Sequence, residues 1–327
     1  MLTGSGNTIS VHLVSLATAN VVATLSIPAS GWNFQPHVTG SHLYFVDTGN
    51  VLKQVDAAGT VTTLLTLTTP NLLANAANPA FVISPDETRV AWGYPISASS
   101  NGNAYKSRVY VAPLNGTPHV LLNDTDDSHG WALPFAWTAQ SIWVARPGFG
   151  LGGAGPFIDY STINSTPMDP ATGALGPLSS CGLSDYLAMN VDGAYLCATT
   201  MSATVHLEVV TPNGSTTLPT ALNNQYGAYR LNPAHSTAVI GLATTQGAGS
   251  QVPWIYTGIE VIQVPSGSGQ TLSDAMIPGP WFDATSLLAV HTTQAQADSV
   301  YSIDLITGAT QKLDGDNRAI GVLPSPT

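Results

Sequence analysis

The chain has 327 residues, of which only 8% are charged, and its formal net charge is −11. Eight Lys and Arg residues are too few to build the basic surface that binds nucleic acid or anionic lipid. A hydrophobic content of 44% can form a large core, which argues against disorder. Long surface helices need Glu, Lys and Arg in quantity, so the composition predicts a β-rich protein whose surface is made of Thr, Ser, Asn and Gly.

The sequence offers no segment for membrane insertion or export. No apolar stretch reaches the 18 residues of a membrane span, and residues 1–8 lack the charged and apolar parts of a signal peptide. The acidic, Lys-poor composition nevertheless predicts an exported protein, extracellular or in the cell envelope, with its targeting segment upstream of this chain. The two cysteines, Cys181 and Cys197, leave open whether they form a disulfide bond.

In chain order, the first predicted element is a hairpin over residues 8–27, and strand–turn–strand units follow it. The clearest unit runs from Phe81 to Trp92, with Pro85 and Asp86 in a tight turn between β-forming flanks. Weaker copies lie at residues 36–46, 134–144, 187–198, 229–242 and 281–290. A second hairpin follows each copy, at residues 51–67, 109–122, 157–178, 205–218, 259–272 and 299–313.

The second strands of these units recur every 43 to 53 residues, marked by His42, Arg89, Ser141, Ala194, Thr237 and Leu287. Four strands in each unit of this length are typical of a β-propeller. We therefore predict an all-β fold, a seven-bladed β-propeller of four-stranded blades that forms a single domain over residues 1–327. The predicted blades cover residues 33–69, 75–124, 129–180, 183–220, 226–274, 278–316, and 1–30 together with 317–327.

The last of these blades combines both ends of the chain. Residues 8–27 supply its outer hairpin, Leu2 and Thr3 end its second strand, and residues 319–325 supply its inner strand. Such a closure leaves the ring without an exposed sheet edge at its joint.

The turn Ile83-Ser84-Pro85-Asp86-Glu87-Thr88-Arg89-Val90-Ala91-Trp92 resembles the repeat of the TolB-like (PD40, WD40-like) propeller family. Glu87 stands where that family usually has Gly, and residues 190–193 and 232–233 are partial copies. The resemblance implies a propeller of the bacterial cell envelope that serves as a binding or scaffold module. It implies no catalytic residues, because the shared turn is structural.

In a propeller, the loops that enter the first strands and those that join second to third strands share one face, the top. The longest insertions, residues 95–107, 146–156 and 244–256, are second-to-third loops. Loops on a rigid scaffold usually carry function. Aromatic residues suited to stacking on a sugar are also expected on this face, so the predicted ligand site comprises Trp32, Trp131, Tyr226, Trp281 and His129. The alternative is that these rings wedge neighbouring blades together.

The densest acidic segment, residues 123–129, contains Asp124, Asp126 and Asp127. Oxygen ligands this close in sequence can hold Ca²⁺, although the spacing is not that of an EF-hand, and a solvated polar turn is the alternative. No other cofactor is predicted.

For catalysis the sequence offers little. Asp127, Asp185 and Asp283 fall near first strands and could face the central channel, as a glycosidase would need, but Asp185 and Asp283 fit turns equally well. The chain has no Gly-x-Ser-x-Gly, His-Glu-x-x-His or Cys-x-x-Cys motif. The Gly-rich residues 148–155 precede no predicted helix, so they do not predict a phosphate site.

The functional prediction is a non-catalytic binding or assembly module with a carbohydrate or protein partner and no nucleic-acid partner. Two alternatives stay open. One is a propeller-type glycoside hydrolase or lyase with a central-channel site. The other is a self-assembling extracellular subunit whose low-charge surface is easily desolvated.

Overall fold

The computed structural model describes residues 2–5, 8–28, 36–47, 49–70, 79–98, 105–123, 130–146, 165–179, 189–201, 204–222, 226–245, 254–272, 276–293, 296–315 and 319–323. Within these ranges the regular structure consists of strands, without a helix, so the all-β prediction is confirmed for them. No helix in the described ranges has the length and apolar character needed to span a membrane.

The strands form seven antiparallel sheets among the described residues, and neighbours along the chain pair within each sheet. The first two sheets are β1 (Leu2–Ser5), β2 (Thr8–Val14) and β3 (Val21–Pro28), then β4 (His37–Val38), β5 (Leu43–Val46), β6 (Val51–Val55) and β7 (Val61–Thr66). The next two are β8 (Ala80–Ile83), β9 (Arg89–Ala98), β10 (Tyr105–Pro113) and β11 (His119–Leu122), then β12 (Leu133–Trp137), β13 (Ile142–Ala145) and β14 (Ser165–Met168).

The remaining three sheets complete the order. The first has β15 (Tyr195–Met201), β16 (Thr204–Thr211) and β17 (Gly214–Leu222), and the second has β18 (Tyr226–Leu231), β19 (Thr237–Thr245), β20 (Trp254–Gln263) and β21 (Gly269–Leu272). The third has β22 (Met276–Trp281), β23 (Ser286–Thr293), β24 (Gln296–Asp304) and β25 (Thr310–Asp314).

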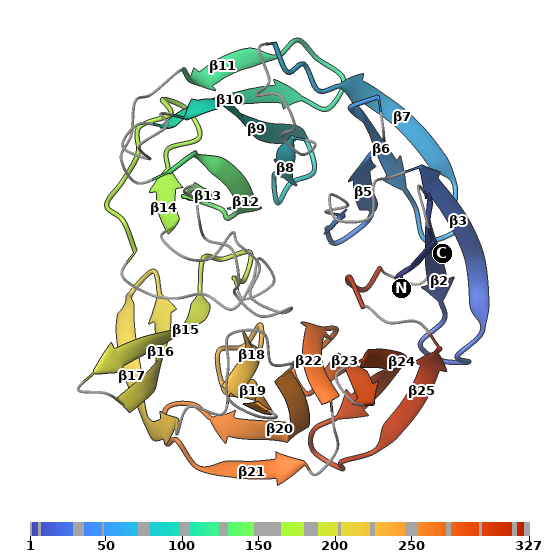
Figure 1. The fold of residues 1–327 in the computed structure, drawn as a ribbon, viewed down its shortest axis with the longest axis vertical. Helices are drawn as coiled ribbons and strands as arrows, with labels where there is room; N and C mark the ends of the chain where they lie inside the picture. Colours follow the sequence, from blue (N-terminus) through green and yellow to red (C-terminus); the bar gives the residue numbers. More distant parts are fainter. Residues whose placement is uncertain are drawn as a thin grey trace.

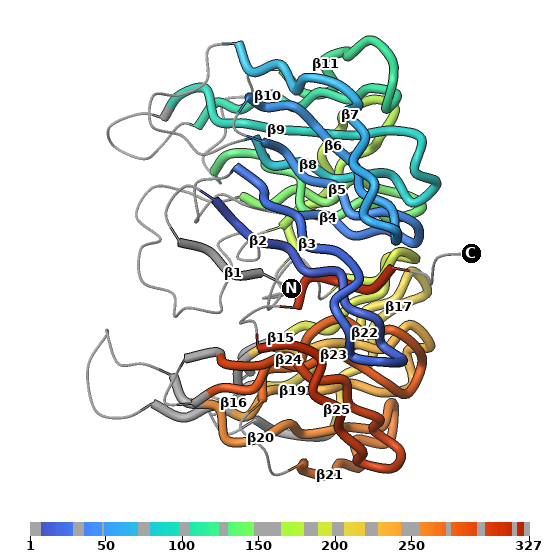
Figure 2. Tube along the Cα trace, turned by 90° about the vertical axis from the view of Figure 1, so that its right-hand side faces the viewer, coloured from blue at the N-terminus to red at the C-terminus, as the bar shows by residue number. Residues whose placement is uncertain are grey.

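The sheets follow one another around a ring, and in each four-stranded sheet the first strand is innermost and the fourth outermost (Figure 1). This is the β-propeller arrangement, with six consecutive blades between His37 and Asp314. The top face holds the second-to-third connections, and the bottom face holds the tight first-to-second and third-to-fourth turns, on the right in Figure 2. The three long insertions of the sequence do join second to third strands, namely β9 to β10, β13 to β14 and β19 to β20.

The hydrophobic core lies between adjacent sheets. One core cluster joins Tyr44 and Leu52 of sheet β4–β7 to Phe81, Trp92 and Tyr94 of sheet β8–β11. Trp92 is completely buried, and its Nε1 donates a 3.0 Å hydrogen bond to the Thr68 carbonyl oxygen. Trp92 therefore packs between these two blades.

The C-terminal residues differ from the prediction. Ala319–Leu323 form no strand, although an inner strand was expected over residues 319–325, and residues 324–327 lie outside the described part. Ile320 still joins the core cluster of Ile9 and Val11, and β1 pairs with β2 as predicted. At Gly321 a Cβ would stand 2.6 Å from Val38 Cβ, so the backbone of this segment lies directly against sheet β4–β7.

Cys197 is completely buried and disulfide-bonded. This resolves, for Cys197, a question that the sequence left open. Cys181, the only other cysteine of the chain, lies outside the described residues.

Candidate functional site

The richest polar cluster of the described residues lies on the bottom face, at the turn that joins β8 to β9. Ser84 begins the turn, and its amide donates to the Arg89 carbonyl oxygen at 2.9 Å. The Asp86 carboxylate accepts hydrogen bonds from the Ser84 hydroxyl at 2.6 Å and from the Thr88 amide at 3.2 Å. Glu87, at the fourth position, has a left-handed backbone with φ of 53°. Such a conformation disfavours side chains other than Gly, so the Glu side chain at this position calls for a compensating interaction.

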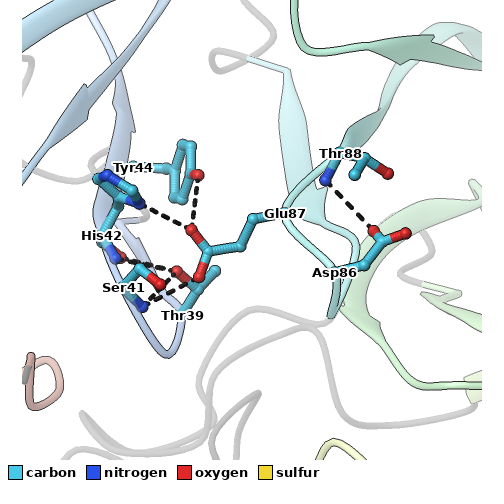
Figure 3. Close-up of polar contacts among 7 residues, drawn as sticks. All are labelled: Thr39, Ser41, His42, Tyr44, Asp86, Glu87 and Thr88. Atoms are coloured by element: carbon cyan, nitrogen blue, oxygen red, sulfur yellow. Dashed lines mark hydrogen bonds and ion pairs between the residues drawn. The ribbon is translucent and has the colours of Figure 1, made fainter.

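That interaction is made with the neighbouring blade (Figure 3). One carboxylate oxygen of Glu87 lies 2.7 Å from His42 Nδ1 and accepts a hydrogen bond from the Tyr44 hydroxyl at 3.1 Å. The other accepts from the Ser41 amide at 2.9 Å. Glu87 therefore ties the first turn of sheet β8–β11 to the first turn of sheet β4–β7.

The electrostatics of this cluster follow from burial and hydrogen bonding. Burial acts to raise the pKa of Glu87, but hydrogen bonds from His42, Thr39, Ser41 and Tyr44 outweigh it and hold the pKa below its ordinary value. Glu87 is thus an anion at neutral pH. Burial, with the negative charge of Glu87, raises the pKa of Tyr44, so its phenol stays protonated and able to donate.

His37, on the inner strand β4, lies close to the same turn. Desolvation lowers its pKa to about 4, against a smaller upward effect of the Glu87 charge. The imidazole of His37 is therefore neutral at pH 7.

Glu87 and His42 form a carboxylate–imidazole pair of the kind that orients a general base or a metal ligand. The described partners of Glu87, however, are all hydrogen-bonding groups of the protein itself. In the described ranges no group of three or more His, Cys, Asp or Glu side chains could hold a metal ion. The cluster can accept a proton or align a hydroxyl, but its contacts are those of a joint between two blades.

Equivalent turns in other blades repeat this joint. His235 occupies the same left-handed turn position with φ of 56°, and its Nε2 lies 2.9 Å from Asp192 Oδ2 of the preceding sheet. Asn232 Nδ2 donates to the Ala284 carbonyl oxygen of the following sheet at 2.9 Å. Asn190 Nδ2 reaches the Asn232 carbonyl oxygen at 3.2 Å. We call these bottom-face contacts the turn belt, and they join successive blades. Because the Glu87 cluster is one of them, its role is structural.

The sequence-predicted aromatic residues are only partly described. Trp32 and His129 lie outside the described residues, as do Asp124, Asp126 and Asp127 of the predicted Ca²⁺ turn. Tyr226 begins β18 at the top face, as expected, but only its backbone is described. The structure therefore brings none of these side chains together into a described site.

Trp131 lies on the top face just ahead of β12, as predicted. It is half-buried, and its Nε1 donates to the Ser97 carbonyl oxygen of the preceding sheet at 3.0 Å. Its ring meets the edge of Tyr105, with the ring centres 5.3 Å apart. These contacts are those of a wedge between two blades, the alternative considered from the sequence.

The predicted position of Trp281 is wrong. It ends β22 and pairs with Leu287 beside the bottom turn, so it does not precede a first strand on the top face. Its ring packs against the core between sheets β18–β21 and β22–β25. The inner strand begins at Met276 and ends at Trp281, so the strand–turn–strand unit predicted over residues 281–290 starts too late along the chain.

Asp283 is a turn residue, the second of its two predicted roles. Its carboxylate accepts hydrogen bonds from the Thr285 amide at 2.7 Å and the Thr285 hydroxyl at 3.0 Å, and these bonds lower its pKa. The other two carboxylates considered for catalysis, Asp127 and Asp185, lie outside the described residues. Of the three carboxylates, the structure therefore places only Asp283, and it lies in a turn.

Sequence reasoning missed the turn belt. The available signal was Glu87 itself, because Glu replaces the Gly expected at a left-handed position. His235 at the matching position of another repeat is a second signal. Both long side chains reach back to the preceding blade.

Comparisons with known proteins support the fold. No protein-family model matches the chain, and no curated protein matches it. Among solved structures, a chain of the mitotic checkpoint complex matches with a TM-score of 0.54 and 11% identity, over 91% of this chain and 85% of that chain.

Two further solved structures are enzymes. Acylaminoacyl peptidase from Pyrococcus horikoshii has a TM-score of 0.54 and 11% identity, and puromycin hydrolase 0.52 and 14%. Each match covers 97% of this chain, which spans only about half of either enzyme, 52% and 53%. At such identities the likeness concerns the fold alone, and it places the chain among β-propellers. The resemblance to the TolB-like family stays a prediction.

Proposed function

We propose that this chain is an exported, seven-bladed β-propeller that binds a carbohydrate or protein partner on its top face and carries out no catalysis. In this proposal, sheet β1–β3 is the seventh blade, and residues 319–323 take the place of its inner strand. The contacts of Ile320 with Ile9 and Val11 support this arrangement. The composition and the TolB-like turn support an envelope or extracellular location.

One observation carries the choice of the top face. The strands β9 and β20 have 10 residues each and stay paired with β10 and β19 up to their top-face ends, whereas β5 and β13 have four residues each. Their two blades lie on opposite sides of the ring (Figure 1). The bottom face is instead occupied by the turn belt. Segments that extend from one face of a rigid scaffold are the usual place for ligand recognition.

The test is a glycan array with the purified protein, read with and without EDTA. Binding of a defined sugar that Trp32→Ala or Tyr226→Ala abolishes is expected. The control is Tyr301→Ala, a half-buried tyrosine in β24. Loss of binding with EDTA would support the Ca²⁺ turn, and so would loss of binding in a triple variant in which Asp124, Asp126 and Asp127 are all replaced by Asn. The control for this variant is Asp169→Asn, in a bottom-face turn.

The same glycans are assayed for cleavage. Release of shortened or unsaturated products would contradict the non-catalytic proposal and favour the glycoside hydrolase or lyase alternative. An absence of both binding and cleavage would contradict the carbohydrate proposal and leave a protein partner to be sought.

A specific observation also favours self-assembly as a second candidate. Large apolar side chains are exposed on the outermost strands of three successive sheets, namely Val21 and Val22 on β3, Val61 on β7 and Val120 on β11. These strands contain no Asp, Glu, Lys or Arg, the residues that commonly protect sheet edges from pairing. Light scattering and electron microscopy should then find oligomers that Val22→Lys and Val61→Lys dissociate, whereas Thr216→Lys on β17 should not.

A further inference from the structure

A cavity of about 440 Å³ lies where sheet β1–β3 meets sheets β4–β7 and β22–β25. We call it the seam cavity. Its walls are mainly aliphatic and include Val11, Leu16, Leu43, Leu288, Leu313 and Ile320. Its volume is within the range of small-molecule binding sites.

The cavity exists because small residues face one another at this junction. Ala17, Ala57, Ala319 and Gly321 are among the described residues that line it, and none of these described lining residues is Phe, Tyr or Trp. At the next junction, by contrast, Trp92 fills the space between the blades. An unfilled space with mainly aliphatic walls favours an apolar occupant.

The seam cavity runs from the core to the surface. Val11 and Leu43 at its inner end are 0% and 1% exposed. Ala17 and Val22 at its outer end are exposed, Val22 to 53%. An elongated molecule could therefore enter from solvent and bury its far end among aliphatic side chains.

Polar side chains along the cavity are few. Those that line it are His12 and Ser15, neighbours on and just after β2. His12 Nδ1 lies 2.7 Å from Asp314 Oδ2, so this carboxylate already has a partner. Apart from His12, which is paired with Asp314, the described lining residues carry no ionisable side chain that could neutralise a charged head group. A hydroxyl or amide could share hydrogen bonds with Ser15 and His12.

We propose that the seam cavity binds a single unbranched aliphatic chain with an uncharged polar head, such as an alcohol or a primary amide. The aliphatic side chains that line the cavity favour the hydrocarbon chain of the ligand, and the shortage of polar side chains favours an uncharged head group. The absence of Phe, Tyr and Trp from the described lining residues disfavours a sugar ring or a planar base, which would stack on such residues. This site is separate from the top face and does not depend on the function proposed for that face.

The test is calorimetric titration of the whole chain with 1-hexanol, 1-heptanol and 1-octanol. Saturable binding at one site is expected, with affinity rising by about fourfold for each added methylene group. Ala57→Leu, which extends a side chain into the cavity, should weaken 1-octanol binding by at least tenfold. Ala58→Leu is the matched control, because Ala58 is exposed in the same turn and does not line the cavity, and it should bind as the parent does.

The outcomes separate clearly. Failure of the parent chain to bind 1-octanol would overturn the proposal, and so would equal weakening by Ala57→Leu and Ala58→Leu. Circular dichroism melting checks that both variants fold. Should Ala57→Leu not fold, methyl NMR of the parent chain decides, because octanol must shift Leu16, Leu288 and Leu313 resonances and leave those of Leu196 and Leu207, in a distant blade, unchanged. None of these results depends on glycan binding.

Discussion

Two junctions of the ring differ in how they are filled. Between sheets β4–β7 and β8–β11, Trp92 is completely buried and stacks on Tyr110 with ring centres 5.2 Å apart. At the seam, aliphatic side chains leave a cavity of about 440 Å³. Both junctions also carry a histidine–carboxylate contact of 2.7 Å, His42 with Glu87 in the first and His12 with Asp314 in the second.

The polar contacts are therefore similar, and the difference lies in packing. Trp92 makes many close van der Waals contacts at its junction. At the seam no side chain of that size fills the space, so the side chains that line the cavity make fewer such contacts. We infer that the blades are held together unevenly around the ring, with the junction at Trp92 stronger than the seam.

The largest expected effect tests the stronger junction. Trp92→Ala should lower the free energy of unfolding by about 3–5 kcal/mol, because it removes a buried indole and leaves a cavity. Denaturant unfolding measures it. Val61→Ala, on an exposed outer strand, should change stability by less than about 0.5 kcal/mol. An unchanged melting curve for Trp92→Ala would mean that the two blades do not pack as described.

The next effect is a pH dependence at the same junction. His37 has a folded-state pKa of about 4, below its ordinary value of 6.5, so the unfolded chain binds more protons between these values. Stability should therefore fall as pH decreases from about 6.5 to 4. Allowing for partial exposure of His37, the loss should be about 2 kcal/mol. In His37→Asn, thermal melts over this range should lose that part of the pH dependence.

Glu87→Gln should have a smaller effect, about 1–2 kcal/mol at pH 7, because neutral hydrogen bonds replace bonds to a carboxylate. The pKa of Glu87 is depressed in the folded protein, so its stabilisation is present above the ordinary pKa and is lost as pH falls through the folded value. The gap between Glu87→Gln and the parent should thus narrow in acid. A constant gap from pH 7 to pH 3 would show that the Glu87 charge does not stabilise this junction.

The smallest effect is a gain at the seam. Ala57→Leu should raise the free energy of unfolding by about 0.5–1 kcal/mol, because it fills part of an existing space. Ala58→Leu should give no such gain. A loss of stability in Ala57→Leu alone would show that the seam has no room for the larger side chain.

Much of the ring was predictable because strand–turn–strand units repeat with a regular period. The turn of Ser84 and Asp86, and the buried Trp92, follow from local sequence. The C-terminal segment did not follow, because its course depends on contact of Gly321 with Val38, far away in sequence. The prediction for Trp281 was wrong for a related reason, because only its pairing with Leu287 shows where β22 ends. The turn belt joins residues about 45 positions apart, which local patterns do not reveal.

The contact between His12 and Asp314 spans 302 positions of the chain. In the proposed closed ring, each blade has two neighbours, and stability is close to a sum over junctions. Opening one junction would then turn a circle into an open array with two end blades, each exposing a formerly covered sheet face. Packing is less complete at the seam than at the Trp92 junction, so opening the ring at the seam would cost less than opening it there. Unfolding would start at the seam and proceed from blade to blade in both directions around the ring. Amide protons of β2 and β25 would then exchange with solvent before those of β8 and β9.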